Sequence, residues 1–228
     1  MNPAATTKPY TRAGKQPRAD GEKTKESILD AAEYLFSYGG LDGVSIRQIT
    51  KRASTDLGSI NYYFGSKIGL FRAVLIRRVA GMTEQRLESL SKLRAGSNKK
   101  NAIREILAAF IAPLFGDSPD QCDQLANYRR LVALVANSKA WQEEVFRQHY
   151  DQAADHYIGA LSKQMPEVSV AQVCWYFNFF LGALTNSIAE TGRVDRLSGG
   201  LCESADLEDM QNNLLNATVP AFMALLRT

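Results

Sequence analysis

The sequence has few of the residues that build metal centres and disulfide frameworks. Its three cysteines, Cys122, Cys174 and Cys202, lie far apart, and their odd number argues against a secreted disulfide scaffold. The two histidines, His149 and His156, are seven residues apart, or about 10 Å along a helix, which is too far for one metal ion without a ligand between them. We therefore expect no metal ion, no cofactor and a reducing, cytoplasmic environment.

Long apolar runs, alternating patterns and catalytic motifs are also missing. The most apolar segment, residues 173–188, is interrupted by polar residues and glycine, so no membrane span is predicted. The polar N-terminus predicts no signal peptide. The sequence contains no phosphate-binding Gly-Lys-Ser/Thr loop, no Gly-x-Ser-x-Gly elbow and no His-Glu-x-x-His pair. These absences indicate a protein that is neither a membrane protein nor an enzyme of those classes.

Apolar residues recur at helical spacing along most of the chain and predict an all-α fold of about nine helices. Three of these helices fit within residues 24–64. The other six are expected at residues 66–93, 103–114, 125–135, 141–165, 170–188 and 206–226. The helix from Ser66 is predicted to be continuous and shared by two domains. Residues 192–204 are predicted to form a loop, and Pro220 to kink or restart the last helix.

Charge is distributed unevenly along the chain. Through Arg78 there are 13 Lys and Arg against 7 Asp and Glu, whereas the rest of the chain has 14 against 17. Residues 1–22 contain proline and glycine and almost no apolar residues, so we predict a disordered basic arm there. The arm could follow a phosphate backbone or enter a minor groove, or it could be a solubilising tail.

Residues 53–67 have the pattern of a tight turn, a short helix and a second helix start. Asp56 is suited to cap the short helix, because its carboxylate can accept hydrogen bonds from the free amides of the first turn. Ile60 and Phe64 are four residues apart and share one buried face. The other positions of this helix carry hydroxyl, amide and phenol groups, which suit phosphates and base edges. Together with the apolar stripe of residues 28–36, the pattern predicts a helix-turn-helix and a supporting helix.

This run of about 50 residues resembles the DNA-binding domain of the TetR/AcrR family of bacterial transcriptional regulators. The residues that carry the resemblance are Ile28–Phe36, Gly39, Val44–Ile49 and Ile60–Lys67. The chain departs from the usual family pattern at three places, where it has Ala53-Ser54-Thr55, Asn61 and Ile68-Gly69. In the family, Ala-Gly-Val is frequent at the first place, Tyr at the second and Glu after the Ser-Lys pair at the third.

The resemblance implies a ligand-responsive DNA-binding regulator, most simply a repressor. We expect residues 1–22 to be the arm, residues 23–68 the helix-turn-helix domain, and residues 69–228 a helical ligand-binding and dimerisation domain. In the major groove of double-stranded DNA, the residues expected nearest the bases are Leu57, Gly58, Ser59, Asn61, Tyr62 and Tyr63. By resemblance to the family, phosphates or a nearby base would be held by Ser45, Arg47 and Lys67.

Aromatic residues are frequent between residues 110 and 180, where they could form a core or line an apolar cavity. The candidate pocket for a small hydrophobic effector comprises Phe110, Tyr128, Arg130, Phe146, His149, Trp175 and Phe179. Its polar members could instead face solvent. The alternative function is a helical enzyme or carrier of apolar molecules.

One short recognition helix reads too few base pairs to be selective, so we expect a homodimer on a pseudo-palindromic operator. The last two helices, near residues 170–188 and 206–226, would form the dimer interface as in the family, and Gly182 and Ala183 would permit close approach. An effector in the pocket would displace the helix from Ser66 and change the spacing of the two recognition helices.

Overall fold

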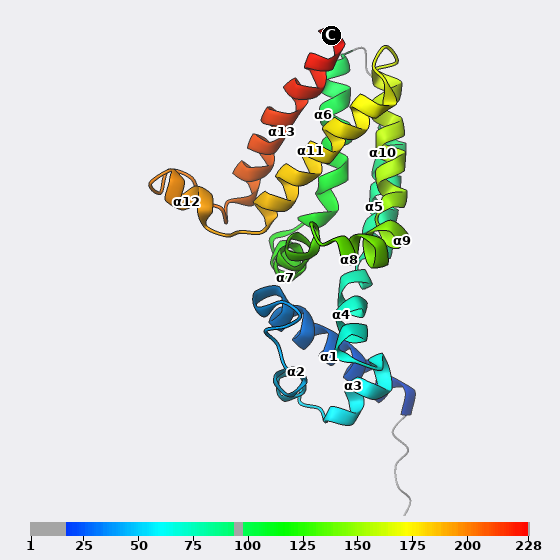
Figure 1. Cartoon of the computed structure of the whole chain (residues 1–228), viewed down its shortest axis with the longest axis vertical. Helices are drawn as coiled ribbons and strands as arrows, with labels where there is room; N and C mark the ends of the chain where they lie inside the picture. Colours follow the sequence, from blue (N-terminus) through cyan, green and yellow to red (C-terminus); the bar gives the residue numbers. More distant parts are fainter. Residues whose placement is uncertain (1–16, 94–97, 228) are drawn as a thin grey trace, which may run out of the picture.

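The computed structural model describes residues 17–93 and 98–227, and these residues form helices and no strand. Figure 1 shows two stacked parts, with α1 to α4 below and α5 to α13 above. Within the described ranges, 11 α-helices have five or more residues, close to the nine helices that were predicted. None of the helices described is long and apolar enough to cross a membrane. The predicted all-α fold class is confirmed.

The lower part contains a long first helix and three short ones. These are α1 (Pro17–Gly39), α2 (Ile46–Arg52), α3 (Leu57–Phe64) and α4 (Lys67–Ile76). Each short helix begins at a side-chain cap, supplied by Ser45, Asp56 and Ser66 respectively. Such a cap satisfies amides that have no partner within the helix, which lets helices of 7 to 10 residues end and restart sharply. The predicted supporting helix and helix-turn-helix are present.

A single apolar core holds these four helices together. Phe36 of α1 and Phe71 of α4 are fully buried, and their ring centroids are 4.9 Å apart. The same core includes Leu131 and Val135, which come from α7 in the upper part. Helix α4, which ends at Ile76, contributes four buried residues to this core and so packs with the lower part.

The first helix begins earlier than predicted. Residues 17–22, expected to belong to a disordered arm, form the first turns of α1. Proline is well tolerated at a first helical position, and Asp20 in the first turn interacts favourably with the helix dipole. The rest of the predicted arm, residues 1–16, lies outside the described residues.

The helix predicted to run unbroken from Ser66 is interrupted at Arg77 and Arg78. It is divided into α4 and α5 (Val79–Lys92). At the break, the Leu75 carbonyl accepts hydrogen bonds from the hydroxyls of Tyr150 (3.0 Å) and Tyr128 (3.4 Å). These long-range contacts, which no helical periodicity encodes, coincide with a joint between the two parts.

The upper part is a bundle of long helices. Its main elements are α6 (Lys99–Ile111), the 3₁₀ turn η1 (Ala112–Leu114), α7 (Pro119–Val135), α10 (Asp151–Gln164), α11 (Val170–Ile188) and α13 (Leu207–Ala224), with η3 (Leu225–Arg227) after it. Phe110 lies at the centre of their core, with its ring centroid within 5.2 Å of those of Tyr157 and Phe177. This aromatic cluster packs the helices on one another and leaves Phe110 buried.

Three predictions about the upper part were inaccurate. The single helix expected at residues 141–165 is divided into α8 (Lys139–Trp141), the π-helical turn η2 (Gln142–Phe146), α9 (Arg147–His149) and α10. The expected loop 192–204 contains α12 (Arg193–Leu197). Of the kink or restart expected at Pro220, the restart does not occur, because α13 is one helix through Pro220, which lies on the exposed side.

Candidate nucleic-acid interface and effector cavities

Helix α3 presents its polar side to solvent. Tyr62 is 82% exposed and Leu57 49%, and Gly58 and Asn61 are exposed beside them. Ile60, on the opposite side, is fully buried and anchors the helix. Within the helix most backbone groups are paired, so the side chains of the exposed side carry most of what α3 can offer to a partner. The exposed set combines an amide, a phenol and apolar atoms, which can contact base edges and thymine methyl groups.

Two of the predicted contact residues on α3 are only half-exposed. The Ser59 hydroxyl lies 2.9 Å from the Thr55 hydroxyl, which donates to it, and 3.3 Å from the Asp56 carboxylate. Tyr63 packs against the core of the lower part and makes an edge contact with Tyr62, with 4.9 Å between ring centroids. Ser59 and Tyr63 therefore position α3 as well as bordering its exposed surface.

Cationic and hydroxyl groups flank α3. Ser45 and Arg47, at the start of α2, are exposed, and the Ser45 amide donates to the Gln48 side chain at 2.7 Å. The Lys67 ammonium donates to the Val44 carbonyl at 2.9 Å, which ties the start of α4 to the loop before α2. An ammonium has three donors, so this bond leaves Lys67 able to contact a phosphate as well. All the predicted contacts thus come from α2, α3 and the start of α4.

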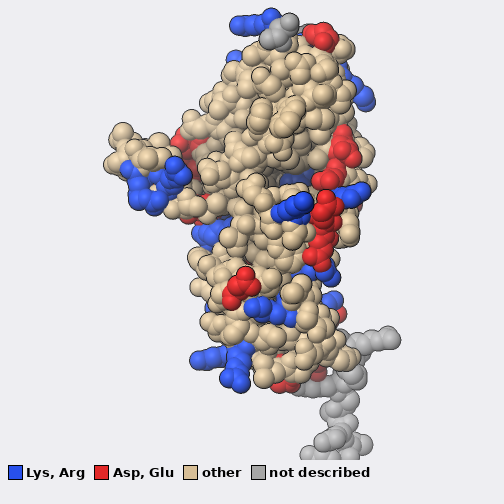
Figure 2. Space-filling view, in the orientation of Figure 1, with Lys and Arg blue, Asp and Glu red and all other residues tan. Residues whose placement is uncertain are grey.

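Sequence reasoning missed two further cations in the last turn of α2. Lys51 and Arg52 are exposed, and the Arg52 guanidinium stacks 3.6 Å from the centre of the Tyr34 ring. Figure 2 shows Lys and Arg side chains at the lower edge of the molecule, beside α2. The charge excess of the N-terminal third was the signal that could have identified them, because phosphate contacts depend on such cations.

The turn between α2 and α3 is strained. Ser54 has φ = 53°, in the left-handed region where glycine is favoured. This is the position at which the sequence departs from the glycine that is frequent in the family it resembles. The Thr55 amide donates to the Thr50 carbonyl at 3.0 Å and helps to close the turn despite this conformation.

The seven residues predicted to form one effector pocket do not lie together. Phe110 and Tyr128 are buried in the core, and the Tyr128 hydroxyl lies 2.7 Å from that of Tyr150. Trp175 and Phe179 are 62% and 58% exposed on the outer side of α11. Aromatic composition alone could not distinguish an inward from an outward helix face, and this explains the error.

The remaining three members do not complete one pocket with the others either. The Arg130 guanidinium is bonded to Glu190 at 2.6 Å and to the Tyr38 hydroxyl at 2.8 Å, so it joins α7 to α1. Phe146 stacks on Tyr150, with ring centroids 4.5 Å apart. His149 borders a groove, of about 850 Å³, between α5 and the segment from α9 to α10. Apolar side chains from α5, including Val79 and Leu87, line the same groove.

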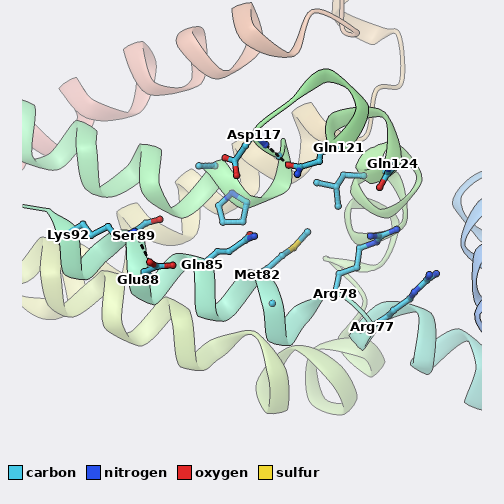
Figure 3. Close-up of a pocket in the computed structure, with 15 residues that line it drawn as sticks. Arg77, Arg78, Met82, Gln85, Glu88, Ser89, Lys92, Asp117, Gln121 and Gln124 are labelled. Carbon is cyan, nitrogen blue, oxygen red and sulfur yellow. Dashed lines mark hydrogen bonds and ion pairs between the residues drawn. The ribbon is translucent and has the colours of Figure 1, made fainter.

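A second cavity, of about 680 Å³, lies on the other side of α5, between α5, η1 and the start of α7. Figure 3 shows Arg77 and Arg78 at one end of it and Glu88 and Lys92 at the other. Its remaining lining includes three glutamines, Gln85, Gln121 and Gln124, together with Met82 and Leu125. The sequence did not predict this cavity, because its polar residues have the spacing of ordinary solvent-facing helix positions. Among the residues that the structure describes, no group of three potential metal ligands gathers.

An uncharged surface extends over α11 and α13. Residues 170–188 contain no Lys, Arg, Asp or Glu, and neither do residues 210–226. Figure 2 shows almost no charge on the upper part of the face over these two helices. The exposed members on α11 are Trp175, Asn178, Phe179, Gly182, Ala183 and Asn186, among others. Such a surface lacks the charges that usually keep an exposed helix solvated.

Comparison with known proteins places both parts in one family. Residues 28–74 match the model for bacterial regulatory proteins of the tetR family, and residues 108–219 match the tetracyclin repressor-like C-terminal domain. Together the two matches span more than half of the chain.

The chain is similar to several curated regulators. It is 36% identical over 88 residues to the transcriptional repressor NicS of Pseudomonas putida, which is 38% of this chain and 40% of NicS. It is 31% identical over 87 residues to the repressor KstR of Rhodococcus jostii, covering 38% and 39% of the two chains. The chain thus spans about two fifths of the length of these relatives. A match to the regulator SrpR of Pseudomonas putida is 22% identical and covers 92% and 88%.

Solved structures support the same fold. A TetR-like transcriptional regulator from Rhodococcus sp. RHA1 superimposes with a TM-score of 0.57 at 20% identity, covering 92% of this chain and 99% of that one. HlyIIR, a hemolysin II transcriptional regulator, superimposes with a TM-score of 0.56 at 18% identity, covering 86% and 97%. At these identities the likeness concerns the arrangement of helices.

Proposed function

The chain belongs to the TetR family of bacterial regulatory proteins, and we propose that it is a repressor that binds a pseudo-palindromic operator as a homodimer. The observation that carries this proposal is α3, a short, capped helix whose exposed side offers Asn61 and Tyr62 and is flanked by Arg47 and Lys67. In the major groove, the amide of Asn61 can bind a base edge in two places, whereas the cations hold phosphates and fix the register. A protein with this function works in the cytoplasm.

Dimerisation is supported by the uncharged surface of α11 and α13. Two copies of this surface, related by a two-fold axis, would bury four helices against one another. Gly182 and Ala183, both exposed, would let the α11 helices approach closely. A dimer doubles the number of base pairs that are read, which selective binding in a genome requires.

Control by an effector is the second half of the proposal. The groove bordered by Val79, Leu87 and His149 combines apolar side chains with polar ones, and it has a suitable size for a small hydrophobic effector with one polar end. Because α4 and α5 meet at a joint and not in one rigid helix, an effector would change the angle at Arg77 and Arg78. The change would alter the separation of the two α3 helices, which must match major grooves about 34 Å apart. A coupling of ~1–3 kcal/mol would lower operator affinity some 5- to 150-fold.

The test begins with a footprint of the purified chain on DNA flanking its own gene. Hydrophobic small molecules are then titrated against a labelled operator complex, and the affinity of each is measured with and without operator. Reciprocity requires the two coupling factors to agree. Absence of any protected DNA would reject the DNA-binding role, whereas a tight ligand that leaves operator affinity unchanged would reject the effector mechanism.

A further inference from the structure

Arg77 and Arg78 take part both in the lining of a cavity and in ion pairs with α1. They line one end of the 680 Å³ cavity beside α5, and their guanidinium groups also bind carboxylates of α1. Arg77 reaches Glu26 at 2.8 Å and Asp30 at 2.7 Å. Arg78 holds Glu33 through two nitrogens, Nε at 3.3 Å and Nη2 at 3.1 Å. The joint between α4 and α5 is therefore fastened to the first helix by ion pairs that also face a cavity.

Glu33 is the critical partner, because it is buried. It is only 4% exposed, whereas the side chains of Glu26 and Asp30 are 46% and 66% exposed. A buried carboxylate that loses its cation is strongly destabilised until water or another donor reaches it. Arg77 lies 3.8 Å from Glu33 and makes no hydrogen bond to it. Removing Arg78 from Glu33 would thus favour separation of α1 from the joint.

The rest of the cavity sets the polarity of a ligand. Glu88 and Asp117, the acidic residues of the lining, lie away from the arginine end (Figure 3). Glutamine side chains between the two ends can donate and accept hydrogen bonds. An anionic group is therefore favoured at the arginine end, whereas at the opposite end the cation Lys92 is already paired with Glu88 at 2.7 Å. The volume is within the usual range for small-molecule sites.

We propose that a small-molecule carboxylate binds in this cavity through Arg78, with Arg77 beside it, and competes with Glu33 for the Arg78 guanidinium. The planar guanidinium of arginine binds one carboxylate through two parallel hydrogen bonds, and the Arg78–Glu33 pair already uses this geometry. The ligand would take the place of Glu33 on Arg78. Glu33 would lose its two hydrogen bonds to that guanidinium and keep the weaker ion pair with Arg77 at 3.8 Å. Its effect on operator affinity rests on the proposed repressor function, whereas the binding itself does not.

Binding is tested on the operator-free protein. The arginine Nε–H signals of ¹⁵N-labelled protein are followed during titration with benzoate and succinate, and with benzamide and succinamide as uncharged counterparts. The Arg78 signal is assigned by its absence in Arg78→Lys. We expect this signal to shift with the carboxylates while the signals of distant arginines stay in place. We expect no arginine signal to shift with the amides. If no carboxylate shifts the Arg78 signal at millimolar concentration, the site does not exist.

Three variants separate competition from general charge effects. Arg78→Lys keeps the charge but loses the two-pronged geometry, and should weaken carboxylate binding about tenfold. Arg147→Gln removes an exposed arginine outside the cavity and should change nothing. Glu33→Gln removes the competing charge and should strengthen binding several-fold. Unchanged or weaker binding to folded Glu33→Gln would overturn the competition, and this result does not depend on whether Arg78→Lys folds.

Measurements of operator affinity in the presence of the carboxylates distinguish this proposal from the proposed repressor function. A carboxylate that binds at Arg78 and lowers operator affinity supports both. A carboxylate that binds at Arg78 but leaves operator affinity unchanged keeps the site and removes its regulatory role. Operator binding that no carboxylate alters, in a protein whose Arg78 signal also stays unchanged, overturns the site and leaves the repressor function standing.

Discussion

Helices α3 and α11 both expose aromatic side chains, but they differ in almost every other respect. Helix α3 has 8 residues, begins at an Asp56 cap and exposes Tyr62 among polar groups. Helix α11 has 19 residues, no charge, and exposes Trp175 and Phe179 beside Gly182 and Ala183. A phenol beside an amide suits a polar groove, whereas aromatic rings beside small residues suit a close apolar contact.

The difference shows that the role of an exposed aromatic side chain can be inferred only together with the residues around it. Around Tyr62 lie cations and hydroxyls that can meet phosphates, so this surface is suited to a polyanion. Around Phe179 lie asparagine, glycine and alanine, so that surface is suited to another protein surface of the same kind.

The largest effect on operator affinity is expected from a charge in the α11 surface. Ala183→Glu would place two carboxylates against each other across the two-fold axis of the proposed dimer. We expect a monomer by sedimentation and a loss of operator affinity of about 100-fold or more, because the two half-sites would no longer be linked. Ser91→Glu, exposed on α5, is the matched control and should remain dimeric. A dimeric Ala183→Glu protein would show that α11 lies outside the interface.

The two cores should respond alike in stability but differently in function. Phe36→Ala and Phe110→Ala each remove a buried ring and should lower the free energy of unfolding by about 3–5 kcal/mol in urea titrations. Phe36→Ala should also weaken operator binding while the dimer persists. If Phe110 were an effector contact outside the core, its substitution would leave stability unchanged and affect effector affinity alone.

The α3 surface should show separable contributions to affinity and to sequence preference. Asn61→Ala should cost about 1–3 kcal/mol on the preferred operator and less on altered ones, because a base-edge contact is lost. Lys67→Ala should weaken binding to all sequences and reduce the salt dependence by about one unit. Both are measured by fluorescence anisotropy over a range of salt. If Asn61→Ala and Tyr62→Ala both bound the operator with wild-type affinity, α3 would not be part of the DNA interface.

The joint between the two parts should be sensitive to high pH. Burial raises the pKa of Tyr128 to about 12, although its hydrogen bond with Tyr150 acts in the opposite direction. Because this folded pKa lies above the unfolded value, the stabilisation is complete below pH 10 and is lost as pH rises toward 12. We expect Tyr128 to account for a fall of about 1 kcal/mol in unfolding free energy between pH 9 and pH 11. The same pH series on Tyr128→Phe should show a smaller fall, and equal falls would contradict the assignment.

The smallest effect concerns the turn before α3. Ser54→Gly should relieve the positive φ and raise the free energy of unfolding by at most ~1 kcal/mol, since glycine also gains entropy in the unfolded chain. Thermal unfolding followed by circular dichroism is sufficient to detect the change. Ser37→Gly, within α1, should destabilise by a similar amount and serves as the opposite control. Destabilisation by Ser54→Gly would indicate that the serine side chain supports the turn.

By itself, the sequence determined the all-α class, the helix-turn-helix and its caps. These features depend on residues within about four positions of one another, such as Asp56 and Ser59 or Ile60 and Phe64, and helical spacing records them directly. Helices α11 and α13 of the upper part could be located for the same reason. The start of α1 at Pro17 was missed because composition suggested disorder and no apolar stripe marks those residues.

The tertiary structure decided where the helices break and where the cavities lie. The break at Arg77 and Arg78 is accompanied by contacts with Tyr128, Tyr150 and Glu33, which are 45 to 75 positions away from their partners. The predicted effector pocket failed for a related reason, because Phe110 and Trp175 share an aromatic character and differ only in what packs against them. Spacing along the chain reports which residues share a helix face, and only the packing of that helix decides whether the face meets a core, a cavity or another molecule.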